Sequence, residues 1–263
     1  MDQHTPERII CLTAETTETL YLLKEQWRIV GVSRFATRPS CALQEKPAVS
    51  TYTTAHLEEI QDLQPDLVLG FSDLQASIAA DLVRRGLAVH IFNQRSINGI
   101  LQMIRMIGGL IDCAEKADAL IGRLETGLDA LRRQTEKWEF RPKVYFEEWD
   151  DPLISGIRWI SELISIAGGD DCFAEFIREP FAKNRIIADP AEVIRRQPDV
   201  ILASWCGKPF DCHRLSTRPG WDSIPAVKSG RVFEIEPSLV LQPGPAALHE
   251  GLAQIHARIA MAT

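Results

Sequence analysis

The sequence predicts an α/β protein: two Rossmann-like lobes with parallel sheets, bridged by one long α-helix. Short apolar runs alternate with amphipathic segments on both sides of the chain's middle. Between them lie about forty residues without proline that carry apolar side chains at three- and four-residue steps. A helix, turn and strand pattern also occurs once on each side of this stretch. We therefore expect an N-terminal lobe at residues 1–95, a bridging helix at 96–137 and a C-terminal lobe at 138–263.

The first lobe contains the helix-start, helix-stop and strand signals expected of a parallel sheet. Residues 67–71 form a continuous apolar run, as in strands buried on both faces. Thr54 can cap the helix that precedes this run, Pro65 stops that helix, and Gly86 terminates the next one. The expected strands cover residues 8–12, 27–32, 46–50, 67–71 and 89–92, with helices beginning near 16 and 54 and another over 76–85.

The stretch 96–137 is expected to link or brace the lobes. At a rise of about 1.5 Å per residue, a helix of this length would run roughly 60 Å, which is longer than one ordinary lobe is wide. A coiled coil is the alternative. Gly108-Gly109 interrupts the middle of the stretch and its charges form no regular flanking pattern, which favours a spanning helix.

The second lobe repeats the organisation of the first. Leu57-Glu58-Glu59-Ile60, followed by Gln64-Pro65-Asp66 and an apolar run, is matched by Ala191-Glu192-Val193-Ile194, followed by Gln197-Pro198-Asp199 and another apolar run. This correspondence predicts two similarly built lobes. The expected strands of the second lobe are 143–147, 200–204 and 231–235, and its expected helices are 159–167, 191–196 and 245–261.

Composition excludes several classes of function. The chain has 263 residues, 45% of them hydrophobic, which is enough to bury a substantial core. A net charge of -7 without any basic run argues against nucleic acid or an anionic membrane surface as partner. No apolar run reaches about 18 residues, so no membrane-spanning helix is expected. Six cysteines without a CxxC pair favour reduced thiols. As written, the chain lacks a secretory signal and is expected in the cytoplasm, or in the periplasm if the native precursor is longer.

Ligands of open parallel sheets bind beyond the carboxyl ends of the strands, and two lobes would place these ends across a cleft. Aromatic and charged residues in such positions suit a large, planar, partly apolar ligand. The alternative for each tryptophan is a place in the core. The candidates after strands are Thr13–Glu15, Arg34, Phe35, Tyr52, Ser72, Asp73, Asn93 and Gln94 in the first lobe, and Glu147, Glu148, Trp149, Trp205, Cys206 and Lys208 in the second.

The stretch 146–151 places four acids around Trp149, just beyond an expected strand. Ionised carboxylates form strong hydrogen bonds, so they could receive ligand amides, ligand hydroxyls or a metal. A solvated acidic loop with only Trp149 packed is the alternative. Arg158, at the end of the same loop, is a further candidate that would hold an anionic group of the ligand or pair with Glu148.

Cys206 and His213 follow another strand and could ligate a metal or a corrin cobalt, but their spacing fits no standard zinc pattern. A packed loop with a free thiol is the alternative, and no metal is assigned. The sequence has no GxGxxG, P-loop, GxSxG or HExxH motif. Cys206 with His213 as nucleophile and base is the remaining enzyme hypothesis. We predict a binding protein without catalytic residues.

Several short motifs occur in an order and spacing that resemble the class III periplasmic binding proteins of cobalamin and ferric-siderophore ABC importers. They include Arg8-Ile9-Ile10-Cys11-Leu12, Val49-Ser50-Thr51-Tyr52, Pro152-Leu153-Ile154-Ser155-Gly156 and Gln242-Pro243-Gly244-Pro245, and the resemblance covers nearly the whole chain. It implies a non-catalytic protein that holds a cobalamin-like corrinoid or related metal chelate in an interlobe cleft for ABC-type import. The corrinoid or iron chelate would be cargo, and no cofactor is expected.

The resemblance also implies roles for individual residues. Tyr52 matches the position of a ring that packs on the corrin, and Glu58 matches a glutamate that docks on an arginine of the transporter. Glu192 lies one residue after the corresponding position in the second lobe and is the second docking candidate. The implied partners are a small-molecule ligand and an ABC transporter permease. A cytoplasmic carrier or sensor of a corrinoid or metal chelate is the alternative.

Overall fold

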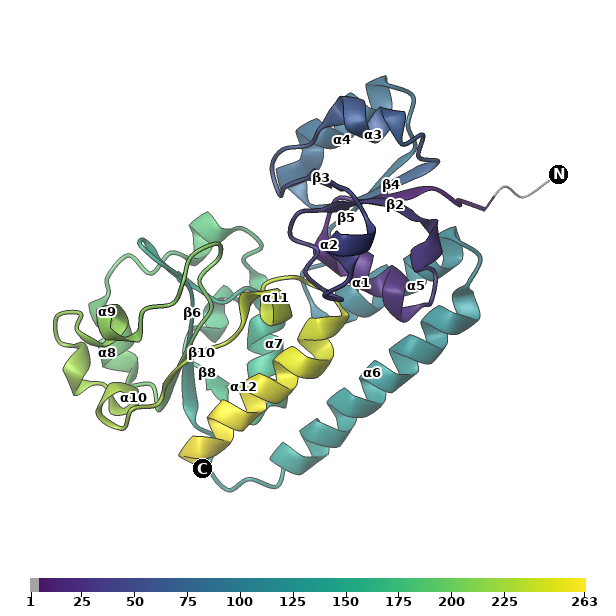
Figure 1. The fold of residues 1–263 in the computed structure, drawn as a ribbon. Helices are drawn as coiled ribbons and strands as arrows, with labels where there is room; N and C mark the ends of the chain where they lie inside the picture. Colours follow the sequence, from purple (N-terminus) through teal and green to yellow (C-terminus); the bar gives the residue numbers. More distant parts are fainter. Residues whose placement is uncertain (1–4) are drawn as a thin grey trace. The chain divides into compact units, whose positions relative to one another are not determined.

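The computed structural model describes residues 5–263, which divide into two compact units. The first unit holds the residues up to Gln94 and Asn98–Leu124, and the second holds Arg95–Ile97 and Glu125–Thr263. Each unit contains its own five-stranded sheet (Figure 1). The predicted α/β fold with two sheet-based lobes and a long connecting helix is confirmed.

The first unit is built on an all-parallel sheet with strand order β3-β2-β1-β4-β5. Its core packs apolar side chains of the strands against the helices, for example Val68 against Ile60 and Leu82. All five predicted strands are present. Its elements are β1 (Ile9–Cys11), α1 (Ala14–Leu22), β2 (Ile29–Ser33), α2 (Ala42–Glu45), β3 (Ala48–Ser50), α3 (Leu57–Asp62), β4 (Leu67–Phe71), the 3-10 helix η2 (Asp73–Gln75), α4 (Ala76–Arg84) and β5 (Val89–Phe92).

The second unit has strand order β10-β9-β6-β7, with β8 paired to β6. Only β7 runs antiparallel among these strands, because β6 continues through Asp150 and turns straight back. The predicted parallel sheet of this unit is therefore mixed, with one antiparallel pair. Its elements are β6 (Lys143–Asp150), β7 (Leu153–Ser155), α7 (Arg158–Ile166), β8 (Asp170–Asp171), α8 (Ala191–Arg196), β9 (Val200–Ala203), α9 (Cys212–Ser216), α10 (Pro225–Lys228), β10 (Val232–Glu234), α11 (Pro237–Val240) and α12 (Leu252–Ile259).

The two Gln-Pro-Asp turns of the predicted internal repeat have the same backbone conformation and the same hydrogen bond. Gln64 and Gln197 both adopt left-handed backbone conformations, with φ of 46° and 49°. After each of them, an aspartate side chain accepts the backbone N–H of the residue that leads into the neighbouring strand: Asp66 from Arg8 at 3.0 Å, and Asp199 from Lys143 at 2.9 Å. The two Gln-Pro-Asp turns therefore connect a helix to a buried strand in the same way in both units.

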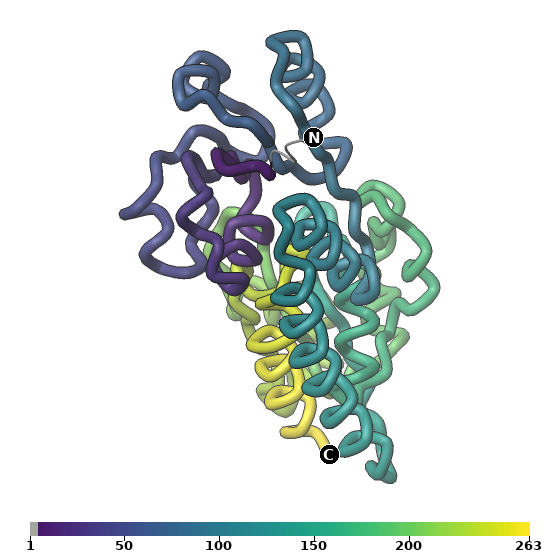
Figure 2. The backbone as a smooth tube through the Cα atoms, turned by 90° about the vertical axis from the view of Figure 1, so that its right-hand side faces the viewer, coloured from purple at the N-terminus to yellow at the C-terminus, as the bar shows by residue number. Residues whose placement is uncertain are grey.

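The predicted single helix over 96–137 is wrong, because two helices occupy this stretch: α5 (Ile97–Leu110) and α6 (Ala114–Thr135). Asp112 adopts a left-handed conformation with φ of 55°, and the amide of Cys113 donates to the carbonyl of Gly108 at 2.8 Å. The second half of α6 belongs to the second unit, where it runs beside α12 (Figure 2). There, the ring of Trp138, just beyond α6, stacks on His256 of α12.

Gly108 permits this turn because the two helices approach closely at its α-carbon. A β-carbon at Gly108 would lie 2.4 Å from that of Ala117, whereas one at Gly109 would meet nothing within 4 Å. We expect Gly108→Ala to destabilise the first unit by about 1–3 kcal/mol through overpacking. The matched variant Gly109→Ala should be neutral or stabilising by up to about 1 kcal/mol, because alanine favours helix. Urea unfolding of both variants tests the assignment, and equal effects would contradict it.

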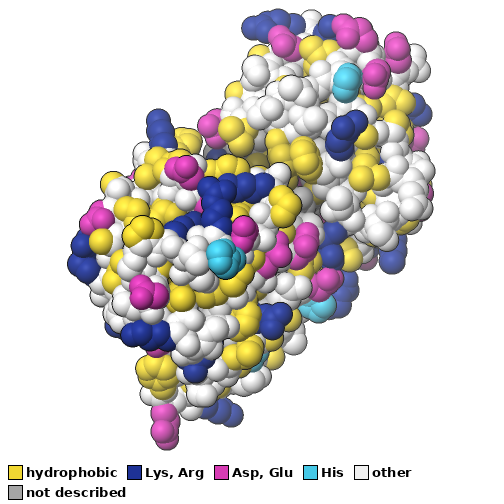
Figure 3. Space-filling model, turned by 60° about the vertical axis from the view of Figure 1, so that its left-hand side comes forward, with side chains coloured by type: hydrophobic (Ala, Val, Ile, Leu, Met, Phe, Trp, Pro, Cys, Tyr) yellow, Lys and Arg dark blue, Asp and Glu magenta, His cyan; other side chains and the backbone are white. Residues whose placement is uncertain are grey.

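The surface carries charges of both signs. On the face in Figure 3, Lys and Arg side chains lie among Asp and Glu side chains on both units. Within the described residues, no helix combines the length and the apolar character that crossing a membrane requires.

Candidate ligand-binding site

Two predicted aromatic residues of the first unit lie together at the carboxyl ends of neighbouring strands. Phe35 follows β2 and Tyr52 follows β3, and their rings stack with centroids 4.5 Å apart and planes 18° apart. Phe35 is 37% exposed and Tyr52 is half-buried. The turn that carries Tyr52 is closed by the Thr51 and Thr54 hydroxyls at 2.7 Å. The pair therefore presents an apolar aromatic surface at the edge of the sheet where ligands of such sheets bind.

Asp73, the other candidate of the first unit, is exposed at the start of η2. The preceding residue, Ser72, accepts the amide of Leu74 at 3.3 Å and so caps this short helix. Asp73 therefore lies beyond the end of β4, in the position that the sequence predicted.

Glu15, which belongs to the candidate stretch Thr13–Glu15 beyond the first strand, is a buried acid. It lies in the first turn of α1, directly beyond β1, and is 2% exposed. Burial raises its pKa to about 7 against the hydrogen bonds from its own amide and from Thr13, and the nearby charge of Glu18 adds to the rise. Its Oε1 atom accepts no hydrogen bond from the described residues. A glutamate in an N-terminal helical turn is so common that its sequence gave no sign of complete burial.

The acids of residues 146–151 are not a solvated loop, because β6 extends through Asp150. Glu147 is completely buried and accepts from the Tyr145 hydroxyl at 3.0 Å and the Trp205 indole at 3.0 Å. Arg218 donates to both of its oxygens, at 2.5 and 2.9 Å. Burial and then the charge of Glu147 raise the pKa of Tyr145 well above its ordinary value, so its hydroxyl remains a donor.

Glu148 also has an arginine partner, but a different one from that predicted. Arg185, 1% exposed, donates to both Glu148 oxygens at 2.8 and 3.0 Å and also to the carbonyl of Ser155. The expected pairing of Arg158 with Glu148 is wrong. Arg158 is exposed and pairs with Glu162 at 2.8 Å, one helical turn further along α7.

Asp150 is the third acid of β6 with basic partners. The Lys208 ammonium contacts its carboxylate directly, and Arg214 lies 3.2 Å from its Oδ2. Burial acts to raise the pKa of Asp150, but these two cations outweigh it, so the pKa lies below its usual value. The Lys208 ammonium also lies over the rings of Trp149, at 4.1 Å, and Trp205, at 5.0 Å. Lys208 and Trp149 are thus adjacent and partly exposed, as ligand contacts must be.

The structure corrects the role expected for Trp205. Its side chain is 1% exposed and belongs to the core of the second unit, where Phe210 packs edge-on against it at 5.0 Å. Its indole N–H donates a hydrogen bond to the buried carboxylate of Glu147. Trp205 therefore supports the surface formed by Trp149 and Lys208 and presents no free face of its own.

Cys206 is exposed, and partial desolvation followed by the charge of Glu148 raises the pKa of its thiol. A raised thiol pKa leaves less thiolate, which is the form that attacks or binds metals. His213 lies on α9 and is exposed. Among residues 5–263 no three His, Cys, Asp or Glu side chains are grouped so that they could hold a metal ion.

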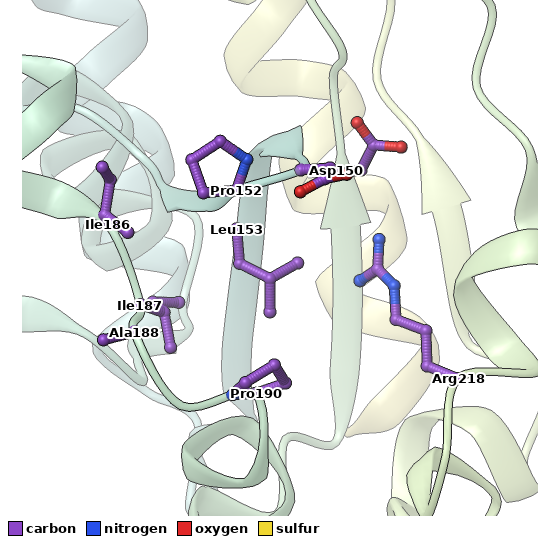
Figure 4. Close-up of a pocket in the computed structure, with 9 residues that line it drawn as sticks. Asp150, Pro152, Leu153, Ile186, Ile187, Ala188, Pro190 and Arg218 are labelled. Carbon is purple, nitrogen blue, oxygen red and sulfur yellow. The ribbon is translucent and has the colours of Figure 1, made fainter.

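A pocket of about 320 Å³ opens in the second unit beside the end of β6 (Figure 4). Leu153, Ile187 and Pro190 supply apolar walls, and Asp150 and Arg218 supply polar ones. Asp151, Pro152, Ile186 and Ala188 complete the lining. The sequence offered no signal for this pocket, because its walls come from segments far apart in the chain.

The two docking candidates occupy equivalent places on the repeated helices. Glu58 is the second residue of α3, with its side chain 82% exposed, and pairs with Arg85 at 3.1 Å. Glu192 is the second residue of α8 and pairs with Arg195 and Arg196 at 2.6 and 2.8 Å. Both carboxylates lie at the surface in pairs that water can break.

Comparison with known proteins gives a consistent result. Residues 9–239 match the family described as periplasmic binding protein. The chain is 27% identical to an uncharacterised ABC transporter substrate-binding lipoprotein of Bacillus subtilis, covering 95% of this chain and 79% of that protein. It is 26% identical to a vitamin B12-binding protein of Vibrio campbellii, covering 90% and 84%.

A periplasmic heme-binding protein of Roseiflexus sp. RS-1, solved in apo form, has the same fold. It superimposes with a TM-score of 0.82 at 23% identity and covers 97% of this chain and 98% of the other. The family consists of binding proteins without catalytic activity, in agreement with the prediction of a binder. The fold, the repeated units and the match over most of its length establish that this chain belongs to the periplasmic binding protein family.

Proposed function

We propose that this chain is the substrate-binding protein of an ABC-type importer and holds a cobalamin-like corrinoid or related metal chelate. The observation that carries this proposal is the stacked, partly exposed pair Phe35 and Tyr52 at the carboxyl ends of neighbouring strands. Flat aromatic surface suits a macrocycle with an apolar face. The similarity to relatives named as vitamin B12-binding proteins supports a corrinoid as the ligand.

The second lobe would contribute Trp149, Lys208 and Cys206 to the same ligand, and the first lobe would add Asp73. Glu148 would act by fixing Arg185, and Arg158 remains a candidate for an anionic group of the ligand. Trp205 would act from the core, by holding Trp149 and Lys208 in place. Relatives described as periplasmic or as lipoproteins support a place of action outside the cytoplasmic membrane.

Glu58 and Glu192 would contact arginines of the permease. Their equivalent positions on α3 and α8 support this role, since two similar lobes can offer one acidic contact each. Each carboxylate would exchange its partner on the surface of its own lobe for an arginine of the transporter.

A tryptophan-fluorescence titration of the purified, metal-free chain separates the possible ligands. Cyanocobalamin, hemin and a ferric hydroxamate siderophore are titrated in parallel, with free tryptophan as a control for absorbance by the ligands. We expect saturable quenching by cyanocobalamin at micromolar or lower concentration. Saturation by hemin or the siderophore alone would reassign the ligand within the same class of binding protein.

The aromatic pair provides a mutational prediction. Tyr52→Ala should weaken corrinoid binding by about 1–3 kcal/mol, roughly 5- to 150-fold in Kd, because it removes a stacking surface. The melting temperature should change little, because Tyr52 is only half-buried. Thr53→Ala, at an exposed position of the same turn, serves as control and should bind as the wild type does. Unchanged affinity of Tyr52→Ala would remove this residue from the site.

A further inference from the structure

The helix α6 crosses the border between the two units, which lies between Leu124 and Glu125. Figure 1 shows α6 as one uninterrupted helix. We infer that α6 is a hinge that bends at Gly122 and Gly127, on either side of this border, and so lets the two units turn relative to each other. Such a hinge would serve any ligand, so it goes beyond the proposed function and can be tested without a ligand.

The first part of α6 is fixed to the first unit. Ala117 packs against Gly108 of α5 so closely that a β-carbon at Gly108 would lie 2.4 Å from that of Ala117. Lys116 pairs at 2.6 Å with Glu25, whose side chain is buried. Movement of this part of the helix would therefore disturb a close helix contact and an ion pair together.

The last part of α6 is fixed to the second unit. The hydroxyl of Thr135, a buried side chain, donates to the carbonyl of Ile166 at 2.9 Å. The ring of Trp138, just beyond the helix, covers Gly168 so closely that a β-carbon there would lie 2.4 Å from the ring. The same ring stacks on His256 of α12 with centroids 5.4 Å apart. These contacts hold the end of the helix in place.

Between these fixed ends, the packing does not require glycine at positions 122 and 127. Both residues are exposed, and a β-carbon at either would meet nothing within 4 Å. Both lie within the helix, so neither needs the left-handed conformation that favours glycine. Glycine nevertheless lowers the equilibrium constant for the helical state about fivefold relative to alanine, because the unfolded backbone has more freedom to lose. Residues 122–127 are therefore the part of α6 that bends or opens most easily.

The chain also crosses the border beside Ile97, the first residue of α5, whose amide donates to Glu162 of the second unit at 2.7 Å. Residues 93–96, just before it, lie outside helices and strands. Loops and element ends absorb changes of backbone angle readily, so the stiffness of the connection depends mainly on α6. A bend in α6 would let the units turn while the contacts at both of its ends stay intact.

Amide hydrogen exchange of the full-length chain, resolved by NMR, tests the bending point in the wild type and in the double variant Gly122→Ala, Gly127→Ala. In the wild type, residues 122–131, whose amides bond across the glycine segment, should have protection factors at least about tenfold lower than those of residues 118–121. Alanine at both positions should raise their protection about 25-fold, the product of the two helix-propensity effects. Equal protection along α6 in the wild type would overturn the inference, as would unchanged protection in the variant.

Residual dipolar couplings of the weakly aligned chain test the movement of the units. The couplings within each unit define its degree of alignment, and units that move independently are aligned to different degrees. We expect these degrees to differ in the wild type and to become nearly equal in the double variant. Gly109→Ala, at an equally open position of α5, is the control and should change neither the protection of residues 122–131 nor the difference in alignment. Equal alignment of both units in the wild type would show that α6 is not a hinge.

Discussion

Replacing Arg218 with methionine is expected to lower the free energy of unfolding by about 3–5 kcal/mol, because it leaves a buried carboxylate without its counter-charge. Glu147 is 0% exposed and lies within the sheet that builds the core of the second unit. The Tyr145 and Trp205 donors remain, but neither supplies a positive charge. Urea unfolding followed by circular dichroism measures the loss.

The double variant Glu147→Gln, Arg218→Met separates the charge from the packing. It should recover most of the lost stability, because a neutral amide can still accept from Tyr145 and Trp205 and no buried charge remains. Arg158→Met serves as control, since its exposed pair with Glu162 is worth less than about 1 kcal/mol. A loss at Arg218 as small as that at Arg158 would show that Glu147 does not depend on its arginine.

Glu15→Gln is expected to remove a destabilisation that develops as the pH rises. Burial raises the Glu15 pKa from 4.5 to about 7, so between these values the folded state holds a proton that the unfolded chain has released. The unfolding free energy therefore falls as the pH increases through this window, by about 3 kcal/mol from this group alone. Below about pH 4.5 the group contributes no such loss.

The measurement is the difference in unfolding free energy between Glu15→Gln and the wild type from pH 4 to pH 8. This difference should rise by about 3 kcal/mol in favour of the variant. The contributions of all other titrating groups cancel, because both proteins contain them. Glu115→Gln, at an exposed position of the first unit, controls for the removal of one carboxylate. A difference that stays flat with pH would mean that Glu15 is charged in the fold without penalty.

Much of the fold could be predicted because its signals are local. The Gln-Pro-Asp turns combine a helix stop, a left-handed residue and an aspartate cap within three positions, and both lead into continuous apolar strands. The break between α5 and α6 was not predicted, because Gly108-Gly109 was interpreted only as evidence against a coiled coil and the stretch was expected to form one helix. What periodicity could not reveal was the close contact between Gly108 and Ala117, which is a property of two helices in space.

The site was less predictable, because its residues depend on partners distant in sequence. The four acids around Trp149 were expected to lie in a loop beyond a strand, as ligand contacts or as a solvated loop, since acidic residues are uncommon in strands. The arginine and lysine partners of Glu147, Glu148 and Asp150 lie between residues 185 and 218, and no spacing rule connects them to β6. The burial of Trp205 likewise depends on Phe210 and Glu147 together. Phe35 and Tyr52 could be predicted as candidates because each follows a strand that the sequence indicates, and the pairing of β2 with β3 then brings them together.

The proposed binding of a corrinoid is tested most directly by equilibrium dialysis of the purified chain against cyanocobalamin, whose absorbance reports its concentration on each side. We expect saturable retention of one cyanocobalamin per chain at micromolar or lower free concentration, and weaker retention by Tyr52→Ala. Equal concentrations on both sides of the membrane, at any protein concentration, would contradict it.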